Sequence, residues 1–424
     1  MFRILAALLI TALSAKTALA IERNVTISLR DPLSNHEILK NENLAEGEVE
    51  IIKAIEAQAA FDDEKALSLL RKMAQSQTAF KEQVWYLLAR VAFRQGLYNE
   101  ARKAFENYLT IKESKAVRQM LSFAQALKKQ PAQKIEKYAA SVVPLQKDKD
   151  DILYTPIKVE GIAENFIIDT GASFSVLSKS FAEKIDLKAL PAKVDFDSIG
   201  TEGITTKLAV VRKVEIGNTV FSNVPFIIVD DAQLNIKKDD DIKGIIGLPL
   251  LSRLGRLEFR KVQGQKSAKY QLSFSESVKQ EGFNNFIFDG FDQILYTKFM
   301  NKDIQLLFDT GAKETCMVLP YLYEKIGSQN IDLAFIKKLE STKLKKQKFA
   351  GVGSVAHRNM KYLSDVDMNI ADQNVRMNRL GMIMGNDDTY RNIQGGIGQD
   401  VLWLYDGYVL DYGKMKFEFI KSGK

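Results

Sequence analysis

The chain has 424 residues and a formal net charge of +7, from 60 basic and 53 acidic side chains. So small a surplus in a chain rich in both signs does not indicate a nucleic-acid-binding protein. A single cysteine, Cys316, excludes an internal disulfide. With only His36 and His357 beside it, the composition argues against a Cys/His zinc site, and no cofactor or metal is expected.

Residues 1–20 have the pattern of an export signal. Arg3 gives a positive start, an apolar run covers residues 4–13, and residues 18–20 form a small-x-small cleavage site. The alternative is a buried N-terminal helix. The apolar run is too short to cross a bilayer permanently, so no membrane span is expected after signal removal. We expect an exported protein, periplasmic if its source has two membranes and otherwise secreted.

A helical domain is predicted over residues 46–140, after a linker at residues 21–45. Its clearest unit, Trp85 to Tyr108, resembles a tetratricopeptide repeat, in which small alanines let paired helices approach closely. A generic helical hairpin would show similar spacing, and both interpretations stay open. Repeats of this kind suit the binding of a protein partner.

The pattern changes after a second linker at residues 141–151. Short β-branched and aromatic runs separated by Gly and Asn predict a mostly β region. We divide it into a first half at residues 152–275, a linker at residues 276–290 and a second half at residues 291–424.

The two halves are related by an internal duplication. Asp-Thr-Gly-Ala occurs at residues 169–172 and again at residues 309–312. Downstream, Gly-Ile-Ile-Gly at residues 244–247 is echoed by Gly-Gly-Ile-Gly at residues 395–398. Matched landmarks in the same order make a duplication far more probable than coincidence.

The repeated motif predicts a pair of catalytic carboxylates, Asp169 and Asp309. Each Asp follows a continuous apolar run and precedes a Gly that permits a sharp turn. Equivalent copies in duplicated halves can meet across a pseudo-twofold axis. Two carboxylates held close together share one proton, so one can act as a base and the other as an acid on a water between them.

With these motifs the sequence resembles the retropepsin-like aspartic peptidases. The resemblance is carried by Asp-Thr-Gly-Ala in each half and by the apolar-apolar-Gly element that follows, which continues in the first half through residues 248–255. It implies an N-terminal helical repeat domain followed by two mostly β lobes that form one bilobal aspartic peptidase acting on a peptide or protein substrate. It covers residues 152 to 424 and says nothing of the helices. No candidate catalytic residue lies in the helical domain, so its deletion is expected to spare the cleavage of short peptides.

Further site residues follow from the motif positions. The hydroxyls of Thr170 and Thr310 can link the two loops, and Gly171 and Gly311 leave backbone N–H groups that can approach the carboxylates. The resemblance also implies glycine-rich flaps over the cleft, or else solvent loops of similar composition. The substrate-binding candidates are Ala172, Ser173, Ala312, Lys313, Gly200, Gly203, Gly351 and Gly353.

The second half departs from the pattern at two positions. Lys313 stands where the first half has Ser173, and Gly396 stands where it has Ile245. Lys313 is either a surface charge or a side chain that points into the cleft. In the cleft it would favour an ionised dyad and attract an acidic substrate side chain.

Three other functions are compatible with parts of the sequence. A nucleophilic Cys316 paired with His357 is not favoured, because nothing orients the two residues toward each other. Residues 351–356 match G-x-G-x-x-A but lack the strand and helix that a nucleotide site needs. The serious alternative is a peptide-binding or scaffold protein with an inactive dyad. All four Asp and Thr residues and both glycines of the motifs are present, which favours the enzyme.

Overall fold

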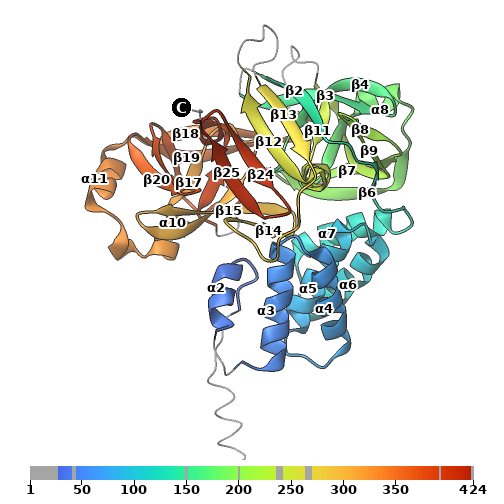
Figure 1. Cartoon of the computed structure of the whole chain (residues 1–424), viewed down its shortest axis with the longest axis horizontal. Helices are drawn as coiled ribbons and strands as arrows, with labels where there is room; N and C mark the ends of the chain where they lie inside the picture. The colour runs from blue at the N-terminus through green and yellow to red at the C-terminus, as the bar shows by residue number, and fades with distance from the viewer. Residues whose placement is uncertain are drawn as a thin grey trace, which may run out of the picture.

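The computed structural model describes residues 27–40, 44–148, 151–198, 201–234, 242–262, 270–390 and 393–421. The predicted signal at residues 1–20 therefore lies outside the described residues. Within them the chain forms an N-terminal helical region and two β-rich lobes (Figure 1). No helix in the described ranges has the length and apolar character needed to cross a membrane.

The helical region consists of helices packed against their neighbours in sequence. After the short helix α2 (Pro32–Ile38), the helices are α3 (Glu46–Ala59), α4 (Asp63–Gln75), α5 (Lys81–Arg94), α6 (Tyr98–Ile111) and α7 (Lys115–Leu127). Alanines with almost no exposure lie where consecutive helices pack: Ala54, Ala66, Ala89, Ala92, Ala101 and Ala104. Their small side chains allow the helix axes to come close.

Lobe 1 begins earlier than the sequence predicted. The predicted helical domain extends to residue 140, but α7 ends at Leu127 and two strands follow, β1 (Lys134–Lys137) and β2 (Ser141–Lys147). Strand β2 pairs with β13 (Tyr270–Ser275), which is distant in sequence. Its burial alternates strictly between buried and exposed, as expected for a strand with one face in a core. Tertiary pairing thus makes strands of residues that carry weak local signals.

The remaining strands of lobe 1 follow in chain order. They are β3 (Leu153–Val159), β4 (Ile162–Ile168), β5 (Ser175–Ser178), β6 (Ala189–Ser198), β7 (Thr201–Val211), β8 (Val214–Ile216), β9 (Thr219–Ser222), β10 (Val224–Val229), β11 (Ile242–Ile246) and β12 (Arg256–Lys261). Short helices α8 (Lys179–Lys184) and α9 (Leu248–Leu251) follow β5 and β11, and 3-10 turns cover Asp231–Leu234 and Ser252–Leu254.

Lobe 2 repeats this arrangement. Its strands are β14 (Phe286–Asp289), β15 (Asp292–Phe299), β16 (Lys302–Phe308), β17 (Cys316–Val318), β18 (Lys345–Gly351), β19 (Ser354–Leu363), β20 (Val366–Ile370), β21 (Gln373–Met377), β22 (Leu380–Ile383) and β23 (Gly395–Ile397). Helices α10 (Leu319–Ile326), α11 (Leu333–Ser341) and α12 (Gln399–Leu402) complete it, with a 3-10 turn at Ser328–Asn330. Strand β14 lies inside the predicted linker at residues 276–290, and α2 inside that at residues 21–45.

The last hairpin of the chain joins the sheet of lobe 1, whereas the described strands β14–β23 of lobe 2 form a separate sheet. The last hairpin of the chain, β24 (Gly407–Asp411) and β25 (Lys416–Ile420), pairs through β24 with β12 of lobe 1. In Figure 1 this hairpin stands between the lobes. One large apolar core runs through both lobes, from Phe166 and Leu257 in lobe 1 to Phe308 and Phe417 in lobe 2. The lobes are therefore joined by backbone hydrogen bonds as well as by apolar contacts.

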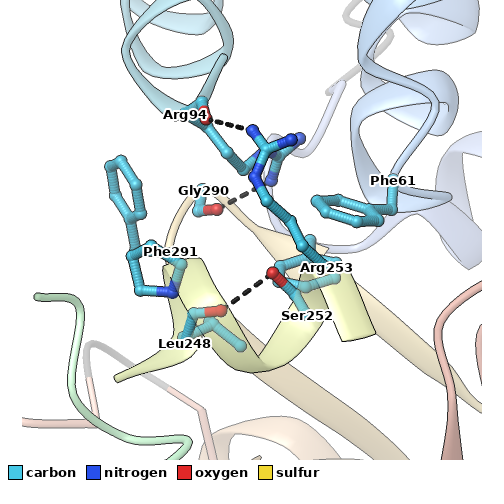
Figure 2. A pocket seen from close by; sticks show the side chains of 9 residues that line it. Phe61, Arg94, Leu248, Ser252, Arg253, Gly290 and Phe291 are labelled. Carbon is cyan, nitrogen blue, oxygen red and sulfur yellow. Dashed lines mark hydrogen bonds between the residues drawn. The ribbon is translucent and has the colours of Figure 1, made fainter. Parts of the chain in front are cut away.

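The helical region lies against both lobes, below them in Figure 1. Helix α7 contacts β6 of lobe 1, and α3 contacts β14 of lobe 2. Figure 2 shows one point where all three parts meet: Arg253 of lobe 1 donates to the carbonyl of Arg94 on α5 at 3.0 Å, and Arg94 donates to the carbonyl of Gly290 of lobe 2 at 2.8 Å. Phe61 of the helical region lines the same small pocket.

Candidate active site

The two Asp-Thr-Gly-Ala loops lie at equivalent places in the two lobes. In lobe 1, β4 runs parallel to β11, and the amide of Asp169 continues this pairing by donating to Ile246 at 3.1 Å. In lobe 2, β16 runs parallel to β23, and the amide of Asp309 donates to Ile397 at 3.3 Å. The duplicated apolar-Gly elements thus hold the duplicated Asp loops in the same way.

The threonines join the loops reciprocally. The hydroxyl of Thr310 accepts a hydrogen bond from the Thr170 amide at 2.9 Å and donates to the Ile168 carbonyl at 2.8 Å. The hydroxyl of Thr170 accepts from the Thr310 amide at 3.0 Å and donates to the Phe308 carbonyl at 3.4 Å. Both threonines are buried, so these bonds form away from competing water. These four hydrogen bonds join the two loops across the lobes.

The Asp169 and Asp309 carboxyl groups come together at the centre of this arrangement. They are in hydrogen-bonding contact with each other, and each Oδ1 accepts from the amide of its own loop glycine, Gly171 at 2.8 Å and Gly311 at 2.7 Å. Neither Asp residue is fully buried, and Gly171 is exposed, so water can reach the pair.

Each loop glycine packs against the carboxyl group of the opposite lobe. A Cβ atom at Gly171 would lie 2.5 Å from the carboxyl carbon of Asp309, and one at Gly311 would lie 2.6 Å from that of Asp169. Carbon atoms that are not bonded do not approach so closely. Glycine is therefore required at both positions for the two carboxyl groups to meet.

The two carboxyl groups differ in how far their pKa values are raised. Burial raises the pKa of the Asp169 carboxyl well above its ordinary value, and the neighbouring Asp309 charge raises it further. Burial also raises the pKa of Asp309, but the Gly311 amide and the Asp169 side chain stabilise its ionised form. The two carboxyl groups therefore titrate as one coupled pair, in which burial favours the retention of a proton.

The substrate-binding candidates lie around the pair with different exposures. Ala172 and Ala312 hold the loops, since their carbonyls accept from Leu248 and Gln399, both at 2.9 Å. Ser173 is half-buried, whereas Lys313 is exposed. The carbonyl of Lys313 accepts from the Asp400 amide at 3.2 Å, which ties its backbone to α12.

The glycine-rich segments lie at the turns of two hairpins, β6–β7 and β18–β19. Gly203 and Gly351 are in the strands beside these turns, Gly353 is in the second turn, and Gly200 lies outside the described residues. The hairpins touch, since the hydroxyl of Ser354 donates to that of Ser198 at 2.8 Å. The Gly353 amide also donates to the carbonyl of Gln233, in the 3-10 turn of lobe 1, at 2.5 Å. The two lobes are thus bridged at the hairpins as well as at the dyad.

Two polar side chains that support the lobe 2 loop escaped the sequence analysis. Gln399 donates to the Thr310 carbonyl at 2.6 Å and accepts from the Trp403 indole at 2.5 Å. Asp400 accepts from the amide and the hydroxyl of Thr315, at 2.8 and 2.7 Å. Lobe 1 has Leu248 and Pro249 at these positions. Extending the alignment of the two halves beyond Gly247 and Gly398 would have shown the replacement.

The structure does not bring Cys316 and His357 together. Cys316 is buried, and its thiol contacts the Tyr390 hydroxyl at 2.9 Å, while His357 is exposed on β19. Burial raises the pKa of the Cys316 thiol to about 11, which disfavours a thiolate nucleophile. Among the residues that the structure describes, no cluster of His, Cys, Asp and Glu side chains could hold a metal ion.

Comparison with known families points to one class of protein. Residues 155–250 match the family model described as aspartyl protease, a stretch that contains the Asp169 loop and ends in α9. This part of lobe 1 thus resembles the aspartyl proteases. No curated protein matches the chain.

Three solved structures show distant likeness. A retropepsin-like aspartic protease from Rickettsia conorii is 19% identical, covering 34% of this chain and 94% of its own, with a TM-score of 0.22. The crystal structure of edgp is 13% identical, covering 67% and 95%, with a TM-score of 0.38. Basic 7S globulin from soybean is 9% identical, covering 68% and 95%, with a TM-score of 0.37.

Proposed function

We propose that the protein is an exported aspartic endopeptidase whose catalytic pair is Asp169 and Asp309. The observation that carries the proposal is the contact between these two carboxyl groups, supported by the reciprocal threonine bonds. The aspartyl protease match over residues 155–250 gives independent support. The substrate class that follows is a peptide or an unfolded protein segment.

The proposed mechanism gives the two carboxyl groups different roles, following the larger rise in the pKa of Asp169. Ionised Asp309 removes a proton from a water molecule held between the carboxyl groups, and that water attacks the carbonyl carbon of the scissile peptide bond. Protonated Asp169 donates a hydrogen bond to the carbonyl oxygen and stabilises the oxyanion that develops there. Collapse of the tetrahedral intermediate then transfers a proton to the leaving nitrogen. Each carboxyl group recovers its starting state, and no covalent bond to the enzyme forms.

The hairpins β6–β7 and β18–β19 are proposed to act as flaps that close over a bound peptide. Their contact through Ser198 and Ser354 supports this role, because two hairpins that meet between the lobes can enclose an extended chain. For the helical region we propose a tetratricopeptide-like unit. Its paired helices and buried alanines support the proposal. A protein partner is proposed for its exposed side.

A peptide-library digestion at several pH values tests the proposed activity. We expect cleavage by the wild-type chain and none by Asp169→Asn or Asp309→Asn. We also expect no trapping by hydroxylamine, since no acyl-enzyme forms. A folded wild-type chain that binds peptides but cleaves none of them would favour the inactive peptide-binding or scaffold alternative.

A further inference from the structure

The side chains beside the two catalytic carboxyls differ sharply between the lobes. Side chains two residues apart on a strand point to the same face, so Ile167 lies on the face that bears Asp169, and Leu307 on the face that bears Asp309. In lobe 1 the strand register places Ile245 next to Ile167, and Val176 next to Ile245. In lobe 2 the same register places Gly396 next to Leu307, and Cys316 next to Gly396.

Lobe 1 therefore has a continuous apolar row on this face, and lobe 2 has a hollow. The row of lobe 1 continues from Val176 to Ile227, whereas that of lobe 2 continues from Cys316 to a second glycine, Gly381. Two isoleucine side chains of lobe 1 thus have no counterpart in lobe 2. The missing volume lies beside the strand that leads into Asp309.

Tyr390 fills the part of this hollow that is nearest to Asp309. A Cβ atom at Gly396 would lie 2.9 Å from the Tyr390 ring, so the ring packs directly on this glycine. The Tyr390 hydroxyl contacts the Cys316 thiol at 2.9 Å. Tyr390 is only 8% exposed and comes from the loop after β22, so a residue distant in sequence occupies the place that Ile245 holds in lobe 1.

A polar network holds this loop in position. Arg358, on strand β19 of the second hairpin, forms a buried ion pair with Asp387 and donates to the Thr389 hydroxyl at 2.8 Å. Its guanidinium group also lies 5.8 Å from the centre of the Tyr390 ring, within the range of a cation–π contact. The Tyr390 amide donates to the Asp387 carbonyl at 3.1 Å. The phenol ring is therefore fixed rather than free to swing out.

We propose that Tyr390 is a specificity-determining residue that closes the side pocket of lobe 2 next to Asp309. The inference rests on the proposed peptidase function. With the hollow over Gly396 filled, the position of the substrate that faces lobe 2 accepts small side chains and rejects large apolar ones. Steric exclusion from a packed pocket is enough for such a preference, since one or two methylene groups change kcat/KM by about 10- to 200-fold.

The test removes the Tyr390 ring and measures two consequences, the reactivity of Cys316 and the cleavage profile of a peptide library. Tyr390→Ala opens the hollow, and Tyr390→Leu opens part of it with less risk to folding. Tyr98→Ala is the matched control, because Tyr98 is a similarly buried tyrosine in the helical region, 5% exposed. Cys316 is the only cysteine of the chain, so its reaction rate with Ellman's reagent reports directly whether the hollow over Gly396 has opened. The second measurement is the cleavage profile of a peptide library.

We expect Cys316 to react at least about tenfold faster in both Tyr390 variants, and the Tyr98 variant to match the wild type. We also expect large apolar residues to become substrates at one position beside the scissile bond, with kcat/KM for those peptides rising about tenfold or more. An unchanged profile in a variant whose Cys316 has become reactive would overturn the proposal.

A second experiment distinguishes a failure of the Tyr390 proposal from a failure of the proposed peptidase function. If the wild-type chain cleaves nothing, the same peptides are compared by equilibrium binding to the wild-type and Tyr390→Leu proteins. Tighter binding of only those peptides that carry a large apolar residue would uphold the role of Tyr390 in a chain without catalysis. Equal binding of all peptides by both proteins would reject it.

Discussion

At the scale of single residues, the dyad combines two carboxyls whose pKa values are both raised by burial. A carboxyl whose pKa is higher in the folded than in the unfolded protein contributes stability below the unfolded value and loses it as pH rises through the folded value. The pair therefore destabilises the fold at neutral pH, when only one proton is shared. The proposed mechanism needs the same proton, so we expect activity and stability to depend on pH in linked ways.

Replacing either Asp by Asn tests this link. We expect Asp309→Asn to abolish turnover and to raise the free energy of unfolding at pH 7 by on the order of 1 kcal/mol, the value of one pKa unit. The gain should shrink toward pH 3, where the carboxyls of both states are protonated. Urea unfolding of both proteins at the two pH values measures it. A gain that is equal at both pH values would contradict the electrostatic explanation.

The loop glycines give a second prediction at this scale. Gly171→Ala places a methyl group against the Asp309 carboxyl, so the two carboxyls must separate. We expect turnover to fall by at least about a hundredfold, because a displacement of about 1 Å in a catalytic geometry costs that much. Gly161→Ala is the control, since a Cβ atom there meets nothing within 4 Å. Gly161 lies between β3 and β4, and its positive φ of 83° carries a local strain without contact with the dyad.

At the scale of elements, the β14–β15 turn is clamped by the helical region. Arg90 on α5 donates to the Asp289 carboxyl at 2.7 Å and to the Asp289 carbonyl, and Arg30 contacts the same carboxyl at 3.1 Å. Gln58 on α3 donates to the Phe288 carbonyl at 2.9 Å. Just beyond the turn, Phe291 stacks at 6.2 Å on Phe174, which lies on the Asp169 loop. The clamp thus connects the helices to the catalytic loop of lobe 1.

Removing the arginine should be costly, because it leaves a buried carboxylate with one partner fewer. We expect Arg90→Ala to lower the free energy of unfolding by about 3–5 kcal/mol, and the double variant Arg90→Met with Asp289→Leu to recover most of that loss. Chemical denaturation measures both. The exposed pair Arg376 and Asp367 is the control, and breaking it should have no measurable effect. A double variant as unstable as the single one would contradict this account.

At the scale of the whole molecule, the helical region is not a detachable module. Phe123 on α7 stacks on Phe174 with ring centres 4.5 Å apart, and Phe93 on α5 meets the same ring edge to face at 5.9 Å. The apolar row of lobe 1, with Val176, Ile227 and Ile245, belongs to the same hydrophobic core as helices α3–α7. The sequence suggested that deleting the helices would spare the cleavage of short peptides. These contacts favour the opposite result.

We therefore expect a chain without residues 44–127 to lose soluble monomer and peptide cleavage together, because the deletion exposes a large apolar surface on lobe 1. Size-exclusion chromatography and a peptide assay measure the two effects. A deletion variant that stays monomeric and cleaves short peptides at the wild-type rate would restore the interpretation of a separable partner-binding module.

The sequence by itself determined which residues carry the candidate chemistry. Asp169, Asp309 and their threonines and glycines lie in a motif repeated in order, and local residue type is sufficient to recognise such a motif. The change from helical to strand periodicity likewise divided the chain into a helical region and a β region, because periodicity is a local property.

Only the tertiary structure decided how these parts fit together. Strand β14 was placed in a linker although it pairs with its neighbour β15. Strands β1 and β2 were missed because their partners β9 and β13 lie far along the chain, and the pairing rather than the local sequence makes them strands. The clamp on Asp289 and the placement of Tyr390 over Gly396 escaped for the same reason. The sequence around a single arginine or tyrosine does not indicate which distant residue it contacts. The filling of the space over Gly396 by Tyr390, and the packing of the helices against lobe 1, are therefore properties of the tertiary structure rather than of the motifs.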